Sequence, residues 1–446
     1  MSTPIDQLVG RAEQALTNYA SFTQEQVDHI GREFGVGQWH VSPIVGQVFE
    51  GHVPQCCHGA RGVDPRQRSC GQLRACPQAY VATLSSQVQR CHSAGMTSTL
   101  RRTVAALLRN YRASGADWPC GDLLPAHDVA MEGYFWRFSD PASGRVVIAL
   151  NGVNHSDDGH WSTLGLAAHP HGFLRTAVHP VGVAATDRLG ASAGDAFVGT
   201  SGRVRVDLAA DAHLDVEVRS PQPWPRKSLG GSSVFQAVPG LNQYWHPWLL
   251  GGSAHGRAVL GTETWALDGW SVYAEKNWGK GGFPDAWWWG QAQGFDDRSV
   301  CVAFAGGQVS AGPFHTAVTA VVVLLPDGTL IRLGNPVVSP VHAEVTDERW
   351  ELRGRSAQWS VDIEGSGSLD TAHVLPVPLP AERRNVPGAI EHLGATMHVT
   401  VRRRGRLIWE GVSTIAALEH GGIARARAEV ARRGHGPHAV DASPVR

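Results

Sequence analysis

A glutamate and a lysine are adjacent in the segment YAEKNWGKGGFPDAWWWGQAQGF, residues 273–295. Side chains of a β-strand alternate between its two faces, so Glu275 shares a face with Tyr273 and Asn277, while Lys276 lies on the other face. Burial among apolar neighbours raises a carboxyl pKa above its usual value of about 4.3 and keeps the group protonated near neutral pH. A neutral carboxyl in an aromatic pocket can act as a general acid. The alternative is a solvated hairpin end.

Tryptophans are concentrated in the same part of the chain, because eight of the 16 fall between residues 245 and 289. In an extended WWWGQAQGF, alternation gives one face two indoles and two amides, from Trp287, Trp289, Gln291 and Gln293. Buried amides suit a cavity that orients a hydroxyl or carbonyl group of a ligand. Plain packing, with the amides facing solvent, is the alternative.

The elements that would position these residues are strands. After residue 126, short alternating or apolar runs such as RVVIALNGV and RWELRGR recur between Gly, Pro, Asp and Asn. PDGT at 326–329 predicts a hairpin turn, because Asp-Gly accepts the positive φ values of tight turns. The pattern predicts a mainly β fold with antiparallel sheets, in a sandwich or a barrel. The Pro-rich passage 220–233 predicts a division into two halves near residue 240.

The first 95 residues differ from the rest of the chain in hydrophobic spacing and in cysteine content. Residues 5–30 show helical spacing, whereas residues 37–92 follow neither the helical nor the strand period and hold five of the seven cysteines. A zinc site is one interpretation, but the cysteine spacings do not form paired C-x2-4-C motifs. We favour an irregular, partly disordered extension, arising from a fusion or from a misassigned start with Met96 as the native one.

Five segments follow from these patterns. They are an extension over 1–95, a lead-in helix over 96–125, a first β domain over 126–240, a second over 241–425, and a flexible tail over 426–446.

The bulk composition excludes some functions. A net charge of -1 and a pI near 7.1 give no basic field for nucleic acid. The amino terminus lacks the pattern of a secretory signal, and no apolar run approaches the roughly 20 residues of a spanning helix. We expect a bacterial protein of the cytoplasm, with peripheral membrane contact as an additional property.

The segment 273–295 closely resembles the signature of tocopherol cyclases and their bacterial relatives, with one extra residue in the glycine turn and Gln293 where the plant enzymes have Asn. MEGYFWRFSDP at 131–141 and STIAALEHGG at 413–422 resemble two further family segments in the correct order. The likeness extends over about 126–425. A weaker likeness to CoA-acylating aldehyde dehydrogenases covers the first 30 residues or so, without a dinucleotide-binding motif.

The family resemblance implies two lipocalin-like antiparallel β-barrel or sandwich halves, related to the carotenoid 1,2-hydratase group. It also implies a reaction without metal or redox cofactor, in which an acid protonates the alkene of a prenylated quinol and the phenolic oxygen closes on the cation. Glu275 is our first candidate for the acid and Glu132 the second. Asn277 and Gln291 would hold the quinol oxygens, and His246 would accept the phenolic proton.

The remaining predicted site residues bind the hydrophobic substrate. Tryptophan faces attract a cation by about 2 kcal/mol when desolvated. These residues are Tyr273, Trp136, Trp245, Trp278, Trp287, Trp289 and Gln293.

Two other functions stay open. A hydratase of the same fold would capture the cation with water, and a non-catalytic carrier would only hold an isoprenoid. An aldehyde dehydrogenase remnant is a more distant alternative.

Overall fold

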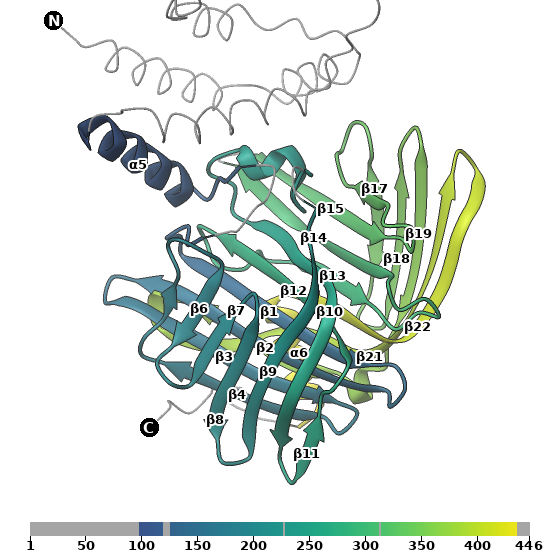
Figure 1. The fold of residues 1–446 in the computed structure, drawn as a ribbon, viewed down its shortest axis with the longest axis horizontal. Helices are drawn as coiled ribbons and strands as arrows, with labels where there is room; N and C mark the ends of the chain where they lie inside the picture. Colours follow the sequence, from purple (N-terminus) through teal and green to yellow (C-terminus); the bar gives the residue numbers. More distant parts are fainter. Residues whose placement is uncertain (1–97, 119–124, 226–227, 312–313, 435–446) are drawn as a thin grey trace, which may run out of the picture. The chain divides into compact units, whose positions relative to one another are not determined.

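The computed structural model describes residues 98–118, 125–225, 228–311 and 314–434, shown as ribbons in Figure 1. The described chain is mainly β, as predicted, and it forms two antiparallel sheets, one of them a curled half-barrel. The expectations for residues 1–95, including the zinc interpretation and the likeness to aldehyde dehydrogenases, lie outside the described residues, as does the Met96 start.

Alternation of apolar and polar side chains accounts for the strands. In β18 (Arg349–Arg355), the charged side chains of RWELRGR are exposed, while Trp350 and Leu352 are buried. A strand with this pattern is stable only when its apolar face packs on other elements. The predicted PDGT hairpin is confirmed between the strands Phe314–Leu324 and Leu330–Leu333, where Gly328 has a φ of +80°.

The first sheet has 12 strands. In hydrogen-bonding order they are β4 (Phe173–His179), β3 (Gly159–His169), β2 (Arg145–Ser156), β1 (Met131–Asp140), β12 (Trp270–Gly279), β10 (Tyr244–Leu260), β9 (Ala212–Pro223), β8 (Arg203–Ala209), β7 (Phe197–Thr200), β6 (Gly190–Ala193) and β5 (Val183–Ala184), and β11 (Glu263–Ala266) pairs with β10. The sheet curls, so that β4 also contacts β8. Its concave side encloses a core that includes Trp136, Phe197 and Trp278.

The second sheet has 10 strands. In hydrogen-bonding order they are β16 (Leu330–Leu333), β15 (Phe314–Leu324), β14 (Cys301–Ala311), β13 (Trp287–Ala292), β22 (Arg406–Gly421), β21 (Arg384–Arg403), β19 (Trp359–Ser366), β18 and β17 (Val341–Val345), and β20 (His373–Leu379) pairs with β21. Short 3-10 helices cover Ser233–Ala237, Leu369–Thr371 and Pro380–Glu382.

The chain passes from one sheet to the other between Gly279 and Trp287, within the tryptophan-rich segment 273–295. The first sheet thus continues well beyond residue 240, because β10 and β12 pair with β9 and β1. The Pro-rich passage at 220–233 connects two neighbouring strands of one sheet, β9 and β10, and contributes the end of β9.

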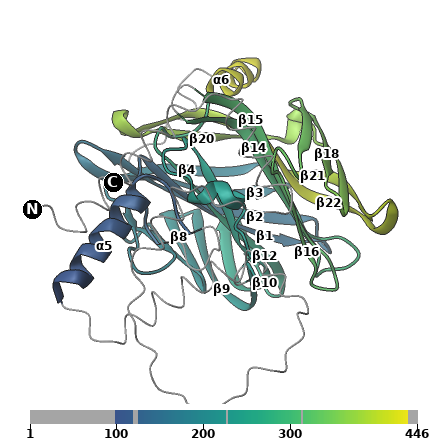
Figure 2. The same ribbon diagram turned by 90° about the horizontal axis from the view of Figure 1, so that it is seen from above.

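Two helices flank the sheets. Helix α5 spans Ser98–Ala113, inside the range expected for a lead-in helix. Helix α6 spans Ile423–Arg432, where the sequence suggested a flexible tail, and it contacts β20 and β21 (Figure 2). Although the helix is rich in arginine, it has a short apolar face, because Ala426 and Val430 are buried against Val374. Residues 435–446 of the expected tail lie outside the described residues.

The two sheets share a second core. Val146 and Ile148 of the first sheet pack with Trp287 and Leu375 of the second. A neighbouring cluster joins Trp245, Tyr273 and Leu250 to Trp289 and Cys301. The indoles of β13 therefore lie between the sheets, next to one face of β12.

Candidate active site

Glu275 lies in this inter-sheet core and is only 5% exposed. Three side chains donate hydrogen bonds to the same carboxyl oxygen, Oε2. Trp245 Nε1 and Trp289 Nε1 each donate at 2.8 Å, and the Tyr273 hydroxyl donates at 2.6 Å. Strand β12 supplies the acceptor and the tyrosine, β10 supplies one indole, and β13 of the facing sheet supplies the other. The site is thus assembled across both sheets.

The electrostatics of Glu275 favour a neutral acid. Burial raises its pKa to about 7, although the three hydrogen bonds offset part of the rise. Burial and the neighbouring Glu275 hold the pKa of Tyr273 well above its usual range, so the phenol stays a donor. Among the described residues, no donor contacts Oε1 of Glu275, which leaves this oxygen available to hold the proton.

Aromatic rings surround the carboxyl. Phe135 of β1 lies directly opposite Glu275 in the sheet register, and its ring meets Trp289 edge-on with 5.3 Å between centroids. The Tyr273 and Trp289 rings are 6.5 Å apart. Both bonded indoles direct the N–H edge of the ring to the carboxyl, and the Phe135 and Tyr273 rings pack beside Trp289.

The opposite face of β12 holds a different cluster. Lys276 is fully buried, and its Nζ lies 2.6 Å from Glu132 Oε2, 2.9 Å from His127 Nδ1 and 3.1 Å from the Pro125 carbonyl oxygen. Burial alone would raise the pKa of Glu132, but Lys276 and His127 hold it well below its usual range. Glu132 is therefore an ionised partner of Lys276, on the face of β12 opposite Glu275.

The predicted amides are already engaged. Gln291 Oε1 accepts a hydrogen bond from Arg137 Nη1 at 2.9 Å. Gln293 Nε2 donates to the backbone carbonyls of Leu250 and Val272, both at 3.1 Å. The two glutamines thus join the sheets. Asn277 is only half-buried, and its Oδ1 has no hydrogen-bond partner among the described residues.

Other predicted residues lie apart from Glu275. Trp136 and Trp278 belong to the core of the curled sheet, where Trp278 stacks on His127 at 4.4 Å. His246 Nδ1 accepts a hydrogen bond from the Gly231 backbone at 3.2 Å, and burial lowers its pKa to about 3. Trp287 lies between the sheets but donates to Glu419.

Sequence reasoning missed two buried carboxyls on the facing sheet. Glu391 of β21 and Glu419 of β22 are directly opposite each other, and Trp289 is the neighbour of Glu419 on β13. Burial raises the pKa of Glu419 to about 7, and burial together with Glu419 holds that of Glu391 well above its usual range. Burial therefore favours the protonated form of both carboxyls next to the Glu275 site, which limits the negative charge there.

The sequence contained a signal for one of these residues. Glu419 lies within STIAALEHGG, the closing segment that resembles the family, whereas no motif marked Glu391. Arg137, which bonds Gln291 and the Ile415 carbonyl, stands in the quoted MEGYFWRFSDP segment but was not identified.

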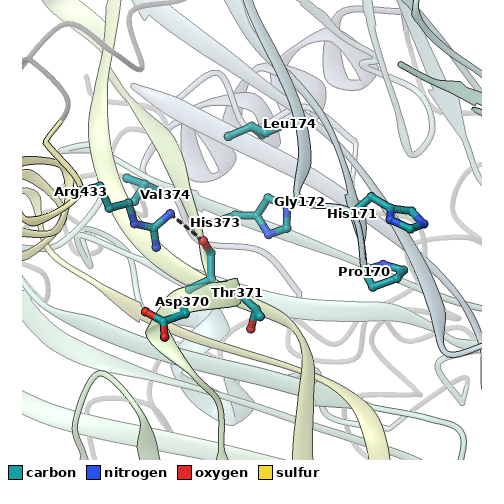
Figure 3. A pocket seen from close by; sticks show the side chains of 10 residues that line it. Pro170, His171, Gly172, Leu174, Asp370, Thr371, His373, Val374 and Arg433 are labelled. Carbon is teal, nitrogen blue, oxygen red and sulfur yellow. Dashed lines mark hydrogen bonds between the residues drawn. The ribbon is translucent and has the colours of Figure 1, made fainter. Parts of the chain in front are cut away.

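An open groove of about 400 Å³ lies elsewhere, between the β3–β4 turn and the start of β20 (Figure 3). His171, Asp370, His373 and Arg433 line part of it, and Arg433 Nη1 donates to the Ala372 carbonyl at 2.8 Å. Its lining residues include none of the groups around Glu275.

No helix in the described ranges has the length and apolar character needed to cross a membrane.

The two antiparallel sheets define a mainly β protein, as the resemblance implied. Residues 208–422 match the model of the tocopherol cyclase-like family, so the predicted resemblance to this family is confirmed over that range. The match begins within β8; it includes Glu275, Trp289 and Glu419, and it excludes Glu132 and Trp136. No curated protein matches the chain.

Three solved structures are similar in fold. Kievitone hydratase from Nectria haematococca is 11% identical, with 69% of this chain and 94% of that chain covered and a TM-score of 0.44. A putative AttH from Nitrosomonas europaea is 15% identical, with 68% and 98% covered and a TM-score of 0.37. CghA in complex with Sch210972 is 12% identical, with 69% and 95% covered and a TM-score of 0.43.

Proposed function

We propose that the protein is a tocopherol cyclase-like enzyme that converts a prenylated quinol to a chromanol, with Glu275 as the acid. The observation that carries the proposal is a buried carboxyl with a pKa of about 7, whose Oε2 accepts three hydrogen bonds while Oε1 stays open. The match of residues 208–422 to the tocopherol cyclase-like family supports the same reaction class.

The first step is protonation of the alkene. An alkene is a weak base, so the acid must be protonated at neutral pH and its conjugate base must be stabilised as it forms. Burial meets the first requirement. The donors Trp245, Trp289 and Tyr273 meet the second, because they are already directed at the oxygen on which negative charge develops.

The reaction also requires a surface that tolerates a tertiary carbocation. Trp245, Trp289 and Phe135 pack in one aromatic cluster, and the two indoles bond the Glu275 carboxyl. A desolvated cation over such a ring gains about 2 kcal/mol. Since these rings offer no lone pair, they stabilise the cation without capturing it.

Ring closure completes the reaction. The phenolic oxygen bonds to the cationic carbon and loses its proton to the Glu275 carboxylate, which restores the acid. The product is an isomer of the substrate, and no electrons are gained or lost. His246 is not required as the proton acceptor, since its one bonded nitrogen faces Gly231 on the other side of the sheet from Glu275.

Fewer residues are available to orient the substrate than the sequence indicated. Asn277 shares the face of Glu275, and its buried Oδ1, which has no hydrogen-bond partner among the described residues, can accept a hydrogen bond from a quinol hydroxyl once side chains move. Gln291 and Gln293 already bond protein groups and instead fix the two sheets around the site. Because Glu275 is 5% exposed, entry of a prenyl quinol requires side chains around it to move.

A prenylated hydroquinone incubated with the full chain in D₂O tests the proposal. Cyclisation by Glu275 gives a chromanol that carries one non-exchangeable deuterium, because the acid proton exchanges with solvent before transfer. Glu275→Gln should reduce turnover by about 100- to 10,000-fold, the usual contribution of a general acid.

Glu263→Gln is the matched control. Glu263 also accepts an indole hydrogen bond, from Trp265 at 2.7 Å, but its side chain is 41% exposed. This variant should keep full turnover. A product that gains one water would assign the site to a hydratase, and bound lipid without turnover in either protein would indicate a carrier. Equal turnover in Glu275→Gln and the native chain would reject Glu275 as the acid.

A further inference from the structure

A cluster of two histidines and one aspartate lies outside the proposed active site. His155 ends β2 and His160 begins β3, and the two face each other directly across this hairpin. Asp128 precedes β1 and approaches both. Its Oδ1 lies 3.4 Å from His155 Nδ1 and 3.2 Å from His160 Nε2. The hairpin belongs to GVNHSDDGHW, residues 152–161, which lies outside the range that matches the family model.

The three candidate ligand atoms lie close together. All three lie within 4.8 Å of one another. Zinc binds nitrogen and oxygen at about 2.0–2.1 Å, so neighbouring ligand atoms of a tetrahedral site are separated by about 3.3 Å. The two measured separations from the aspartate oxygen match such an edge. The 3.4 Å separation is long for a hydrogen bond between a ring nitrogen and a carboxylate, and the 3.2 Å separation is at the upper end of the usual range.

The carboxylate is held in place by its backbone. Asp128 has a φ of +58°, a left-handed conformation that is uncommon for a residue with a side chain. Its backbone N–H donates to Glu132 Oε1 at 2.8 Å, and Glu132 is the buried partner of Lys276. The His155 backbone N–H donates to the Ala130 carbonyl at 2.9 Å, which fixes the hairpin to the same segment. The backbones that carry Asp128 and His155 are therefore held near each other before any metal arrives.

We propose that Asp128, His155 and His160 form a surface site for a divalent transition metal ion of the zinc class. Two imidazoles and one carboxylate suit zinc, nickel and copper better than magnesium or calcium, which prefer oxygen ligands. The three side chains are 63%, 44% and 42% exposed, so water can complete the coordination. The site is independent of the cyclase proposal, because none of its residues takes part in the Glu275 chemistry.

Metal titration of the full chain tests the site. After removal of metal by chelation, Zn²⁺ binding is measured by calorimetry, and Co²⁺ is titrated to record its d–d absorption. The double variant His155→Ala/His160→Ala should lose one equivalent of Zn²⁺ relative to the native chain. Asp128→Asn should weaken that equivalent by at least about tenfold, since loss of even an outer-sphere partner costs 10- to 100-fold.

Two controls isolate the cluster. His342→Ala removes an exposed histidine that pairs with a single carboxylate, Glu344, at 3.1 Å and should leave binding unchanged. A cobalt–thiolate charge-transfer band would report binding to cysteines elsewhere in the chain, and it should persist in the double variant if it occurs. Equal stoichiometry and affinity in the native chain and the double variant would overturn the proposal.

Discussion

Strand β12 separates two buried glutamates with opposite properties. On one face, Glu275 accepts three hydrogen bonds from neutral groups, two indoles and a phenol. On the other face, Glu132 meets the Lys276 ammonium at 2.6 Å and also accepts the backbone N–H groups of His127 and Asp128 at 2.9 and 2.8 Å. Both carboxyls are buried, so burial alone cannot explain the difference between them.

The charge of the donors decides the protonation state. Neutral donors only partly offset the desolvation of Glu275, and its pKa rises to about 7. A cation at hydrogen-bond distance outweighs the same penalty at Glu132 and lowers its pKa. Strand alternation therefore gives two adjacent residues separate roles. Glu275 is a weak, largely neutral acid, and Lys276 is the cation of a buried ion pair.

The largest expected effect comes from breaking the ion pair. Lys276→Met leaves the Glu132 carboxyl buried without its cation, which should lower the free energy of unfolding by about 3–5 kcal/mol. Denaturant titration of the variant and the native chain measures the difference. The double variant Glu132→Gln/Lys276→Met should lose less than Lys276→Met, because no charge remains unpaired.

Lys280→Met serves as the matched control. Lys280 is exposed and lies four positions further along the same segment, so its loss should change stability by less than about 0.5 kcal/mol. Equal losses from the two lysine variants would show that the buried pair contributes nothing specific.

The pH dependence of stability should separate the two carboxyls. Glu275 binds its proton more tightly in the folded chain, so its contribution is full below pH 4.5 and is lost as the pH rises to about 7. One pKa unit corresponds to about 1.4 kcal/mol, which gives a loss of about 3 kcal/mol across that window. The difference in unfolding free energy between the native chain and Glu275→Gln, measured from pH 4 to pH 8, reports this loss.

Glu132 should behave in the opposite way. Its folded pKa is lowered, so its contribution is present above the ordinary carboxyl pKa and is lost as the pH falls below it. The same comparison with Glu132→Gln should thus show stability that decreases toward acid. Slopes of the same sign for the two variants would contradict the assignment of Glu275 as neutral and Glu132 as ionised.

The sequence predicted the local geometry better than the partners. Alternation placed Glu275 and Lys276 on opposite faces and Trp287 and Trp289 on one face, because the period of a strand is a local property. It could not show that Lys276 pairs with Glu132 or that Trp245 bonds Glu275, since these contacts join strands that are distant in sequence.

The fold shows the same limit. The mainly β architecture was predictable from strand patterns, but the passage between the sheets was not, because the sequence patterns placed β12 and β13 together in one domain over 241–425. In fact the two strands join different sheets. Glu391 was not predicted for a related reason. It lies near Glu275 only because β21 pairs with β22, a strand that is distant from β12 in sequence.

The smallest expected effect tests a single donor. Trp289→Phe removes one of the hydrogen bonds to the Glu275 carboxylate while it keeps an aromatic ring between the sheets. Hydrogen bonds to charged groups contribute about 1.5–3 kcal/mol, so the pKa of Glu275 should rise by about one unit or more. The carboxyl C=O stretching band, identified by its absence in Glu275→Gln, measures this pKa in an infrared titration.

Trp288→Phe is the control. The indole of Trp288 donates at 3.0 Å to Thr319 on the other face of β13, so this substitution should leave the pKa of Glu275 unchanged. A similar shift in both variants, or a lower pKa in Trp289→Phe, would mean that packing rather than the indole N–H groups sets the acidity of Glu275.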